Sequence, residues 1–199
     1  MTFEDIKKHV IASGSDNVGT FGGEYRGGAY VQQHPDEIAE VLEFLLNAKP
    51  SYENMLEVGS AAGGNAKMFC EILNIKNLLI IDDNQHLMHT VRSENLKNIN
   101  YEEYIGNSQS KSASDWVTSF GRKFDIIYID ADHSYVGVKN DVENYLKFLK
   151  PDGYMIFHDY FACEGVKKIV DSIRTYNLDK TLITTARYCG IAVCKNLNE

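Results

Sequence analysis

The sequence predicts an α/β fold with a doubly wound, mostly parallel sheet that helices cover on both faces. Three observations lead to this prediction. Short apolar runs of strand length alternate with segments whose apolar residues recur at helical spacing. The first clear strand, Met55–Val58, breaks into a loop of small residues that opens a helix. Two short strands end the chain with no helix between them, which is typical of a hairpin containing one antiparallel strand.

The elements follow from local signals. Pro35 suits the first position of a helix, and Asp36 and Glu37 suit the positive end of its dipole. Apolar residues of this helix recur at helical spacing and would pack on the sheet: Ile38, Val41, Leu42, Leu45 and Leu46. After the small-residue loop, we expect helices over 65–73, 86–93, 112–120, 136–149 and 165–176. We expect the remaining strands over 78–81, 124–129, 154–157, 182–185 and 191–194, with a further one that ends at Tyr104 and Ile105.

Length and charge narrow the classes of function. A chain of 199 residues can bury the core of one domain, which we place at residues 35–199. A net charge of -8 disfavours a nucleic-acid partner, because binding phosphates needs a concentrated basic surface. No apolar run approaches the roughly 20 residues that span a bilayer, so no membrane partner is expected. Four cysteines without paired ligand spacing and an acidic start without a signal-peptide core favour a cytoplasmic location.

Residues 1–34 are expected to form a separate lid or substrate segment. Six glycines fall between Ser13 and Gly28, and Tyr25 and Tyr30 stand among and just after them. This composition is too polar and too flexible for a core, but it carries aromatic side chains that could touch a substrate. An active-site lid and a disordered connector explain it equally well.

The loop after the first strand is a candidate ligand site. Gly59 and Gly63 can adopt positive φ without Cβ strain, and small residues let backbone N–H groups approach a ligand, as in nucleotide-binding crossover units. A dinucleotide fits less well, because Ala61 stands where the pyrophosphate fingerprint has glycine and Glu57 would repel a pyrophosphate. Asp82, at the end of the next strand, is placed to bind the two hydroxyls of a ribose.

Ionisable residues gather where two further strands end: Asp130, Asp132, His133, His158 and Asp159. Ligands of open α/β sheets bind beyond such strand ends. Two carboxylates in one cleft repel each other unless a cation or a proton lies between them, and oxygen ligands suit Mg²⁺ or Mn²⁺. A metal would lower the pKa of a substrate hydroxyl, and Asp132 or His133 could accept its proton. The alternative is that Asp130 and Asp159 only cap the following helices.

Together, these motifs resemble class I S-adenosylmethionine-dependent methyltransferases. The most specific block runs from Asp130 to Asp159 and contains Asp-x-Asp-His-x-Tyr, Leu-Lys-Pro-Asp-Gly and Phe-His-Asp-Tyr. It is similar to small-molecule and sugar O-methyltransferases related to macrocin and aminocoumarin-sugar O-methyltransferases, and more distantly to catechol O-methyltransferase. The resemblance covers nearly the whole chain from Tyr30 onward. It implies a Rossmann-like, mostly parallel, seven-stranded sheet with one antiparallel strand near the C-terminus.

The resemblance also implies roles for matching residues. Those expected to bind S-adenosylmethionine are Glu57, Gly59, Ser60, Gly63, Asp82, Ser108, Gln109 and Asp130. Asp130, His158 and Asp159 match metal positions, and Asp132 matches a general base, with His133 as its rival. The sugar enzymes often have aspartate where His158 stands, so His158 could be a ligand, a base or a neighbour of the ligands. A homodimer is implied by the resemblance alone.

We therefore expect methyl transfer from S-adenosylmethionine to a hydroxyl of a small molecule, such as a sugar, assisted by Mg²⁺ or Mn²⁺. One alternative is an S-adenosylmethionine-binding protein without transfer activity. Another is a nucleotide-binding oxidoreductase, against which Glu57 and the lack of a Tyr-x-x-x-Lys pattern argue. Methylation of nitrogen or of a macromolecule is disfavoured by the acidic charge and the short chain.

Overall fold

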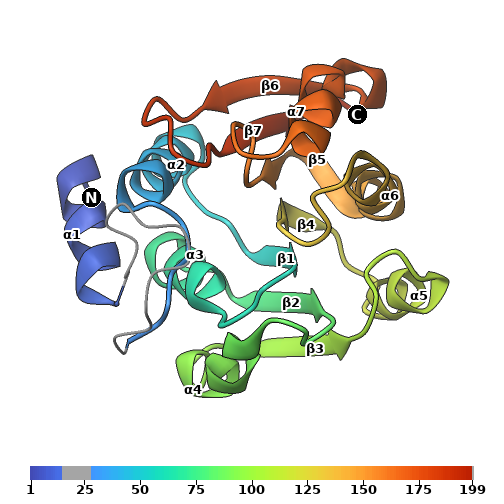
Figure 1. The fold of residues 1–199 in the computed structure, drawn as a ribbon. Helices are drawn as coiled ribbons and strands as arrows, with labels where there is room; N and C mark the ends of the chain where they lie inside the picture. Colours follow the sequence, from blue (N-terminus) through green and yellow to red (C-terminus); the bar gives the residue numbers. More distant parts are fainter. Residues whose placement is uncertain (15–27, 199) are drawn as a thin grey trace.

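The computed structural model describes residues 1–14 and 28–198. In this part of the chain, seven strands form one sheet in the order β3-β2-β1-β4-β5-β7-β6 (Figure 1). Their bounds are β1 Asn54–Val58, β2 Asn77–Asp82, β3 Tyr101–Ile105, β4 Phe124–Ile129, β5 Leu149–Phe157, β6 Leu178–Ile183 and β7 Ala192–Asn196. Strand β7 runs in the direction opposite to the other six and is antiparallel to both of its neighbours, β5 and β6. The strand order reverses between β1 and β4. The predicted fold class is confirmed.

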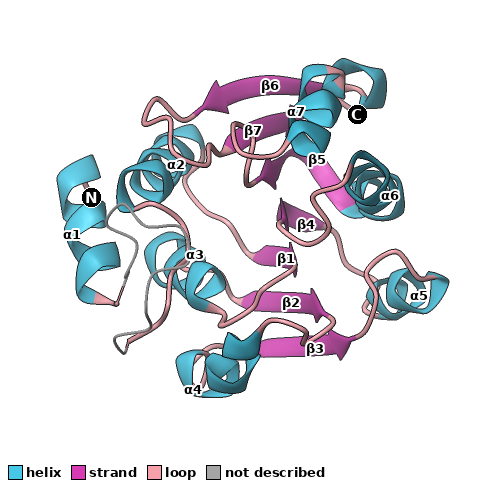
Figure 2. Ribbon diagram, viewed as in Figure 1, coloured by secondary structure: helices cyan, strands magenta, loops and turns pink. Residues whose placement is uncertain are grey.

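Helices cover both faces of the sheet (Figure 2). Their bounds are α1 Phe3–Ala12, α2 Pro35–Ala48, α3 Gly64–Leu73, α4 Arg92–Asn95, α5 Lys111–Ser119, α6 Tyr135–Tyr145 and α7 Glu164–Asp171. Three 3-10 turns join them: η1 Leu87–Val91, η2 Leu146–Phe148 and η3 Ile173–Tyr176. Helices α1, α2 and α3 pack on one face, and α5, α6 and α7 pack on the other. No helix in the described ranges is both long and apolar enough to cross a membrane.

The core consists of two apolar layers separated by the sheet. All five residues of β1 are buried, because this central strand has a neighbour on each side and a helix layer on each face. Successive side chains point to opposite faces, so Met55 belongs to the layer under α2 and α3, while Leu56 belongs to the layer under α5 and α6. The continuous apolar runs in the sequence therefore reflect strands that are buried on both faces.

The N-terminal segment differs in part from the expectation. Helix α1, which we did not predict, starts with a capping box between Thr2 and Asp5. Its Ile6 and Val10 are fully buried in the same layer as α2, so residues 3–12 contribute to the domain core. The expected lid lies mainly within 15–27, outside the described residues, and a boundary at residue 34 stays a prediction.

Several element boundaries also differ: the strand expected over 182–185 is β6, which begins at Leu178, and the helix expected over 165–176 is α7 followed by η3. The helix expected over 86–93 is the 3-10 turn η1 followed by the short α4, because no residue of η1 is buried and no apolar stripe sustains a longer helix. Helix α6 ends at Tyr145, short of the expected 149. Strand β5 begins at Leu149 rather than near 154, and its pairing with β4 shifts register between Phe124 and Ile126.

Candidate active site

The glycine loop after β1 is held against the end of β4. Gly59 has φ +82°, and a Cβ built there would lie 2.2 Å from the backbone oxygen of Asp130. Only glycine fits such an approach. Gly63, the N-cap residue of α3, also has positive φ. Ala61 has φ 46°, so the glycine that the fingerprint has at this position would be less strained there.

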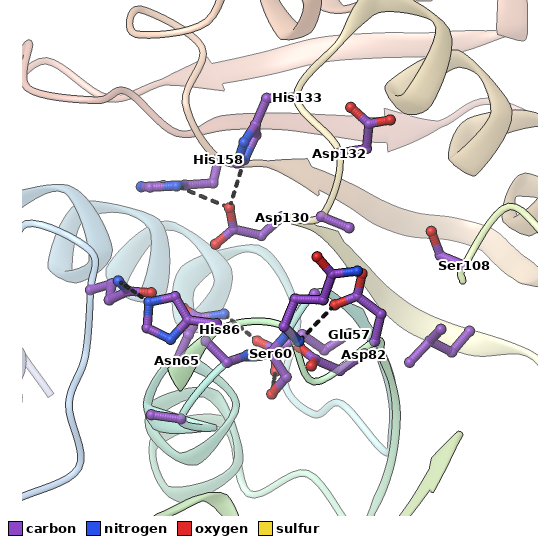
Figure 3. Close-up of a pocket in the computed structure, with 18 of the residues that line it drawn as sticks. Glu57, Ser60, Asn65, Asp82, His86, Ser108, Asp130, Asp132, His133 and His158 are labelled. Carbon is purple, nitrogen blue, oxygen red and sulfur yellow. Dashed lines mark hydrogen bonds and ion pairs between the residues drawn. The ribbon is translucent and has the colours of Figure 1, made fainter. Parts of the chain in front are cut away.

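Glu57, the fourth residue of β1, is a buried carboxyl beneath this loop. The Ser60 hydroxyl donates to it, and the Asn65 side-chain amide donates to Glu57 Oε1 at 2.6 Å (Figure 3). Burial, with the charge of Asp130 adding to it, raises the pKa of Glu57 to about 7 although both hydrogen bonds oppose the rise. Because a nearby cation favours the charged form of a carboxyl, Glu57 is suited to an amino group of a ligand.

Asp82 ends β2 and ties the loop to its neighbours. Its Oδ2 accepts hydrogen bonds from the backbone N–H groups of Ser60 (2.8 Å) and Ala61 (2.9 Å), and its Oδ1 accepts one from Asn84 (2.7 Å). The guanidinium of buried Arg92 lies 2.8 Å from Oδ1. Although burial raises the pKa of Asp82, these N–H groups and Arg92 bring it below its ordinary value. Asp82 is therefore charged, and it holds the loop in shape.

The loop after β3 forms a second wall. Ser108 is buried, and its backbone oxygen accepts the hydroxyl of Tyr145 from α6. Gln109 donates through Nε2 to Asp132 Oδ2 at 3.1 Å, and the Ser134 N–H donates to Asp132 Oδ1 at 2.9 Å. The Ser134 hydrogen bond contributes most to lowering the pKa of Asp132. Asp132 thus faces Gln109 and lies away from the other residues at the strand ends (Figure 3).

Four side chains from the ends of β4 and β5 meet at one point. Asp130 Oδ1 lies 3.2 Å from both His133 Nε2 and His158 Nδ1. Asp159 Oδ2 lies 3.1 Å from His133 Nε2 and 3.4 Å from His158 Nδ1. The structure therefore brings together Asp130, His133, His158 and Asp159, as expected from parallel strands that end at the same edge. It does not bring Asp132 into this group.

Asp130 and the two imidazoles of this group have shifted pKa values. Burial would raise the pKa of Asp130, but His158 and His133 lower it to about 2. The hydrogen bond to Asp130 raises the pKa of His133. Burial would lower the pKa of His158, but Asp130 and Asp159 raise it well above its ordinary value. Asp130 and the two imidazoles therefore stabilise one another's charged forms.

The group also fits a divalent cation. His158 Nε2 and Asp159 Oδ1 are buried and find no hydrogen-bond partner in the described part of the chain. Buried polar atoms of this kind usually indicate a bound water or ion. Asp159 has φ 62°, a conformation uncommon for a residue with a side chain, and such strain clusters at functional sites. Two carboxylates and an imidazole are donors that Mn²⁺, Fe²⁺ or Zn²⁺ accept.

Sequence reasoning missed several residues of this site. Gln33 is 2% exposed and donates through Nε2 to Asp130 Oδ2 at 3.0 Å. Asn65 and Arg92 support Glu57 and Asp82, as described above. None of these polar side chains belongs to a motif, so no local pattern could identify them. Only the position of Gln33 just before a helix start was a hint that it lies near the domain.

These groups line one open cavity of about 730 Å³ over the C-terminal ends of β1, β2 and β4. The predicted site residues among its lining are Glu57, Gly59, Ser60, Asp82, Ser108, Gln109, Asp130, Asp132, His133, His158 and Asp159. Gly63, the N-cap residue of α3, is not part of the lining. Tyr30, Gln32 and His86 form another part of the wall. A single ligand could contact the glycine loop, Asp82 and the strand-end group at once.

Comparison with known proteins identifies a family. A family model described as a methyltransferase domain matches residues 56–160, more than half of the chain. An uncharacterized protein of Acanthamoeba polyphaga mimivirus is 28% identical over 111 residues, which are 53% of this chain and 50% of that protein. The match thus spans about half the length of this curated relative.

Solved structures share the fold. An O-methyltransferase from Bacillus cereus in complex with S-adenosylhomocysteine has a TM-score of 0.63 at 17% identity, over 98% of this chain and 90% of that chain. The N-methyltransferase NodS from Bradyrhizobium japonicum, also with S-adenosylhomocysteine, has a TM-score of 0.59 at 18% identity, over 80% of this chain and 87% of that chain. The mycinamycin-pathway methyltransferase MycE, in complex with Mg and S-adenosylhomocysteine, has a TM-score of 0.50 at 17% identity, over 72% of this chain and 45% of that chain.

Proposed function

The chain belongs to the methyltransferase-domain family, and from that premise we propose that it transfers a methyl group from S-adenosylmethionine to a hydroxyl of a small molecule. The observation that carries this proposal is the single cavity. It joins a glycine loop with two acids to a group of titratable side chains at the ends of β4 and β5. The first part suits the cofactor, and the second suits a hydroxyl that must lose its proton.

The proposed cofactor position follows the walls of the cavity. Glu57 and the loop residues Gly59, Ser60 and Gly63 would hold the methionine end, with the Glu57 carboxylate near the amino group. Asp82 would accept the ribose hydroxyls, and Ser108 and Gln109 would contact the adenine. The three structural neighbours described above hold S-adenosylhomocysteine, which is the product that this cofactor leaves. Asp130 would border the sulfonium side.

A hydroxyl acceptor needs a group that takes its proton, because an alcohol is a weak nucleophile until it is deprotonated. We assign this role to His133 rather than Asp132. His133 faces the strand-end group and is partly exposed to the cavity, whereas both carboxylate oxygens of Asp132 accept other hydrogen bonds. His133 must first lose the proton that Asp130 and Asp159 stabilise, so the reaction should be faster at higher pH.

Asp130, His158 and Asp159 are the proposed ligands of a divalent metal, for which the sequence suggests Mg²⁺ or Mn²⁺. Such an ion lowers the pKa of a hydroxyl bound to it.

The amides of Gln32, Gln33 and Asn107 also line the cavity, and amides suit an acceptor that carries many hydroxyls. We therefore propose a sugar or a sugar-containing metabolite as the acceptor.

The first test is calorimetric titration of S-adenosylhomocysteine into the purified protein, with NAD⁺ as the control ligand. We expect micromolar binding of the first and none of the second. Transfer of a labelled methyl group is then screened on hydroxylated sugars, with Asp130→Ala as the inactive control. Failure of S-adenosylhomocysteine to bind at any metal concentration would overturn the proposal, and binding without transfer to any acceptor would indicate a cofactor-binding protein.

A further inference from the structure

The loop between β6 and β7 brings a thiol to the strand-end group. Cys189 lies about thirty residues after Asp159 in the sequence, but its backbone oxygen accepts hydrogen bonds from the N–H groups of Phe161 (2.7 Å) and Ala162 (3.2 Å). The N–H of Tyr160 donates to the backbone oxygen of Gly190 at 3.0 Å. These hydrogen bonds attach the loop to the turn after β5 and place Cys189 beside Asp159.

Cys189, His158 and Asp159 form a compact set of possible metal ligands. One ligand atom from each residue lies within 4.8 Å of the others. His158 and Asp159 are 6% and 4% exposed. Within the described ranges, His158 Nε2 and Asp159 Oδ1 have no hydrogen-bond partner. Since buried polar atoms without partners cost free energy, these two atoms indicate that something absent from the protein chain itself binds here.

The charge around this set also favours a cation. The buried Glu37 of α2 accepts hydrogen bonds through Oε1 from Gly190 (2.8 Å) and Tyr188 (3.1 Å), on either side of Cys189. Its Oε2 has no partner among the residues described. In that part of the chain, no Lys or Arg pairs with Glu37, Asp130 or Asp159. The carboxylates therefore lack a cationic partner other than imidazole.

We propose that the metal centre of this protein binds a transition-metal ion of the Zn²⁺ or Co²⁺ class through His158, Asp159 and the Cys189 sulfur, in preference to Mg²⁺. Mg²⁺ favours oxygen ligands and retained waters, whereas imidazole nitrogen and thiolate sulfur suit Zn²⁺, Co²⁺ and Fe²⁺. The inference rests on the proposed function, but it replaces Asp130 with Cys189 among the ligands and Mg²⁺ or Mn²⁺ with a transition-metal ion. His133 stays outside this ligand set and can keep its proposed role as acceptor of the hydroxyl proton.

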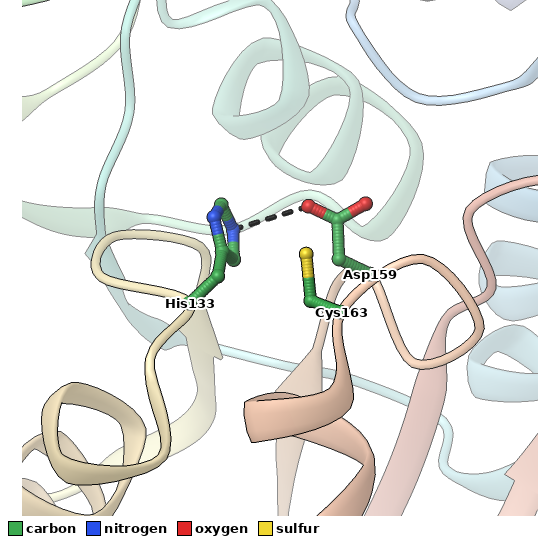
Figure 4. A group of neighbouring side chains, drawn as sticks. All are labelled: His133, Asp159 and Cys163. Carbon is green, nitrogen blue, oxygen red and sulfur yellow. Dashed lines mark ion pairs between the residues drawn. The ribbon is translucent and has the colours of Figure 1, made fainter.

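A second thiol offers a competing set. His133, Asp159 and Cys163 also have ligand atoms within 4.8 Å of one another, and they point toward one another in Figure 4. We favour the set with Cys189 because its imidazole, that of His158, is buried. His133 is about one-third exposed, and its Nε2 already contacts Asp130 and Asp159. The two cysteines thus provide a matched pair of variants.

The test is titration of Co²⁺ into the metal-free full-length protein, followed by absorption spectroscopy. We expect visible d–d bands, together with a near-ultraviolet charge-transfer band that only a thiolate ligand produces. Cys189→Ser should remove the charge-transfer band and weaken Co²⁺ binding at least about tenfold, since loss of even an outer partner of a metal ligand costs about 10- to 100-fold. Cys163→Ser should keep the band, and excess Mg²⁺ should not displace Co²⁺.

Several outcomes would overturn the inference. These are no spectral change on adding Co²⁺, a band kept in both variants, a band lost only in Cys163→Ser, or displacement of Co²⁺ by Mg²⁺. Circular dichroism of each variant would identify a folding defect. Titration of S-adenosylhomocysteine into the same preparations separates the two proposals, because the cofactor can bind when the metal assignment fails, and Co²⁺ can bind when the cofactor assignment fails.

Discussion

Replacing Glu57 with glutamine is expected to remove the pH dependence that this buried carboxyl gives to stability. Burial raises the pKa of Glu57 from 4.5 to about 7. Between these values the folded chain holds a proton that the unfolded chain has lost, so the free energy of unfolding falls as pH rises through this window. A pKa raised this far corresponds to about 3 kcal/mol of stability that is present below about pH 4 and lost above about pH 7.

Urea denaturation of the wild type and Glu57→Gln at several pH values between about 4 and about 8 measures this effect. The other titrating groups are common to both proteins, so the difference between the two profiles isolates Glu57. Glu102→Gln, at an exposed position of β3, is the matched control and should follow the wild type. Parallel profiles for the wild type and Glu57→Gln would refute the reasoning, because Ser60 and Asn65 would then keep Glu57 charged throughout.

Three further variants probe the loop and the strand-end group. Gly59→Ala places a Cβ against the Asp130 backbone at positive φ and should destabilise the fold by at least about 1–2 kcal/mol in urea denaturation; wild-type stability would contradict the close approach. Arg92→Lys keeps the charge beside Asp82 but loses the guanidinium fork, so it should cost about 1–3 kcal/mol by the same assay and weaken S-adenosylhomocysteine binding in calorimetry. His133→Gln should slow methyl transfer by about 10²–10⁴-fold without changing S-adenosylhomocysteine affinity, and an unchanged rate would exclude it as the base. Wild-type rates should rise with pH, because the hydrogen bond to Asp130 raises the pKa of His133, which must lose its proton before it can act as a base.

Strands buried on both faces were the most predictable part of the fold. Their apolar runs, such as Phe124–Ile129, are continuous because no position faces solvent, and the structure places β4 at these residues. Helix α1 was missed because only Ile6 and Val10 are buried in it, and so few apolar positions do not distinguish a helix from a polar terminus. The early start of β5 was missed because Pro151, Asp152 and Gly153 indicate a turn.

The candidate site was predictable where residues stand in a motif beside a strand end. Parallel strands end at one edge, so the strand order alone brings Asp130 and His158 together. The orientation of Asp132 was not predictable, because it depends on Gln109 from a different loop. Cys189 likewise reaches Asp159 only through backbone hydrogen bonds between two loops that the sequence does not link.

The layers of the fold, the strand edge that carries the site and the residue types at that edge follow from the sequence, because hydrophobic periodicity and small-residue turns act over a few neighbouring positions. Which polar side chains contact one another depends on the packing of the whole chain. Gln33 meets Asp130 and Arg92 meets Asp82 across long stretches of chain. Such contacts are set by how whole elements pack, and a single polar residue in a loop or at a helix start carries no local signal of its partner.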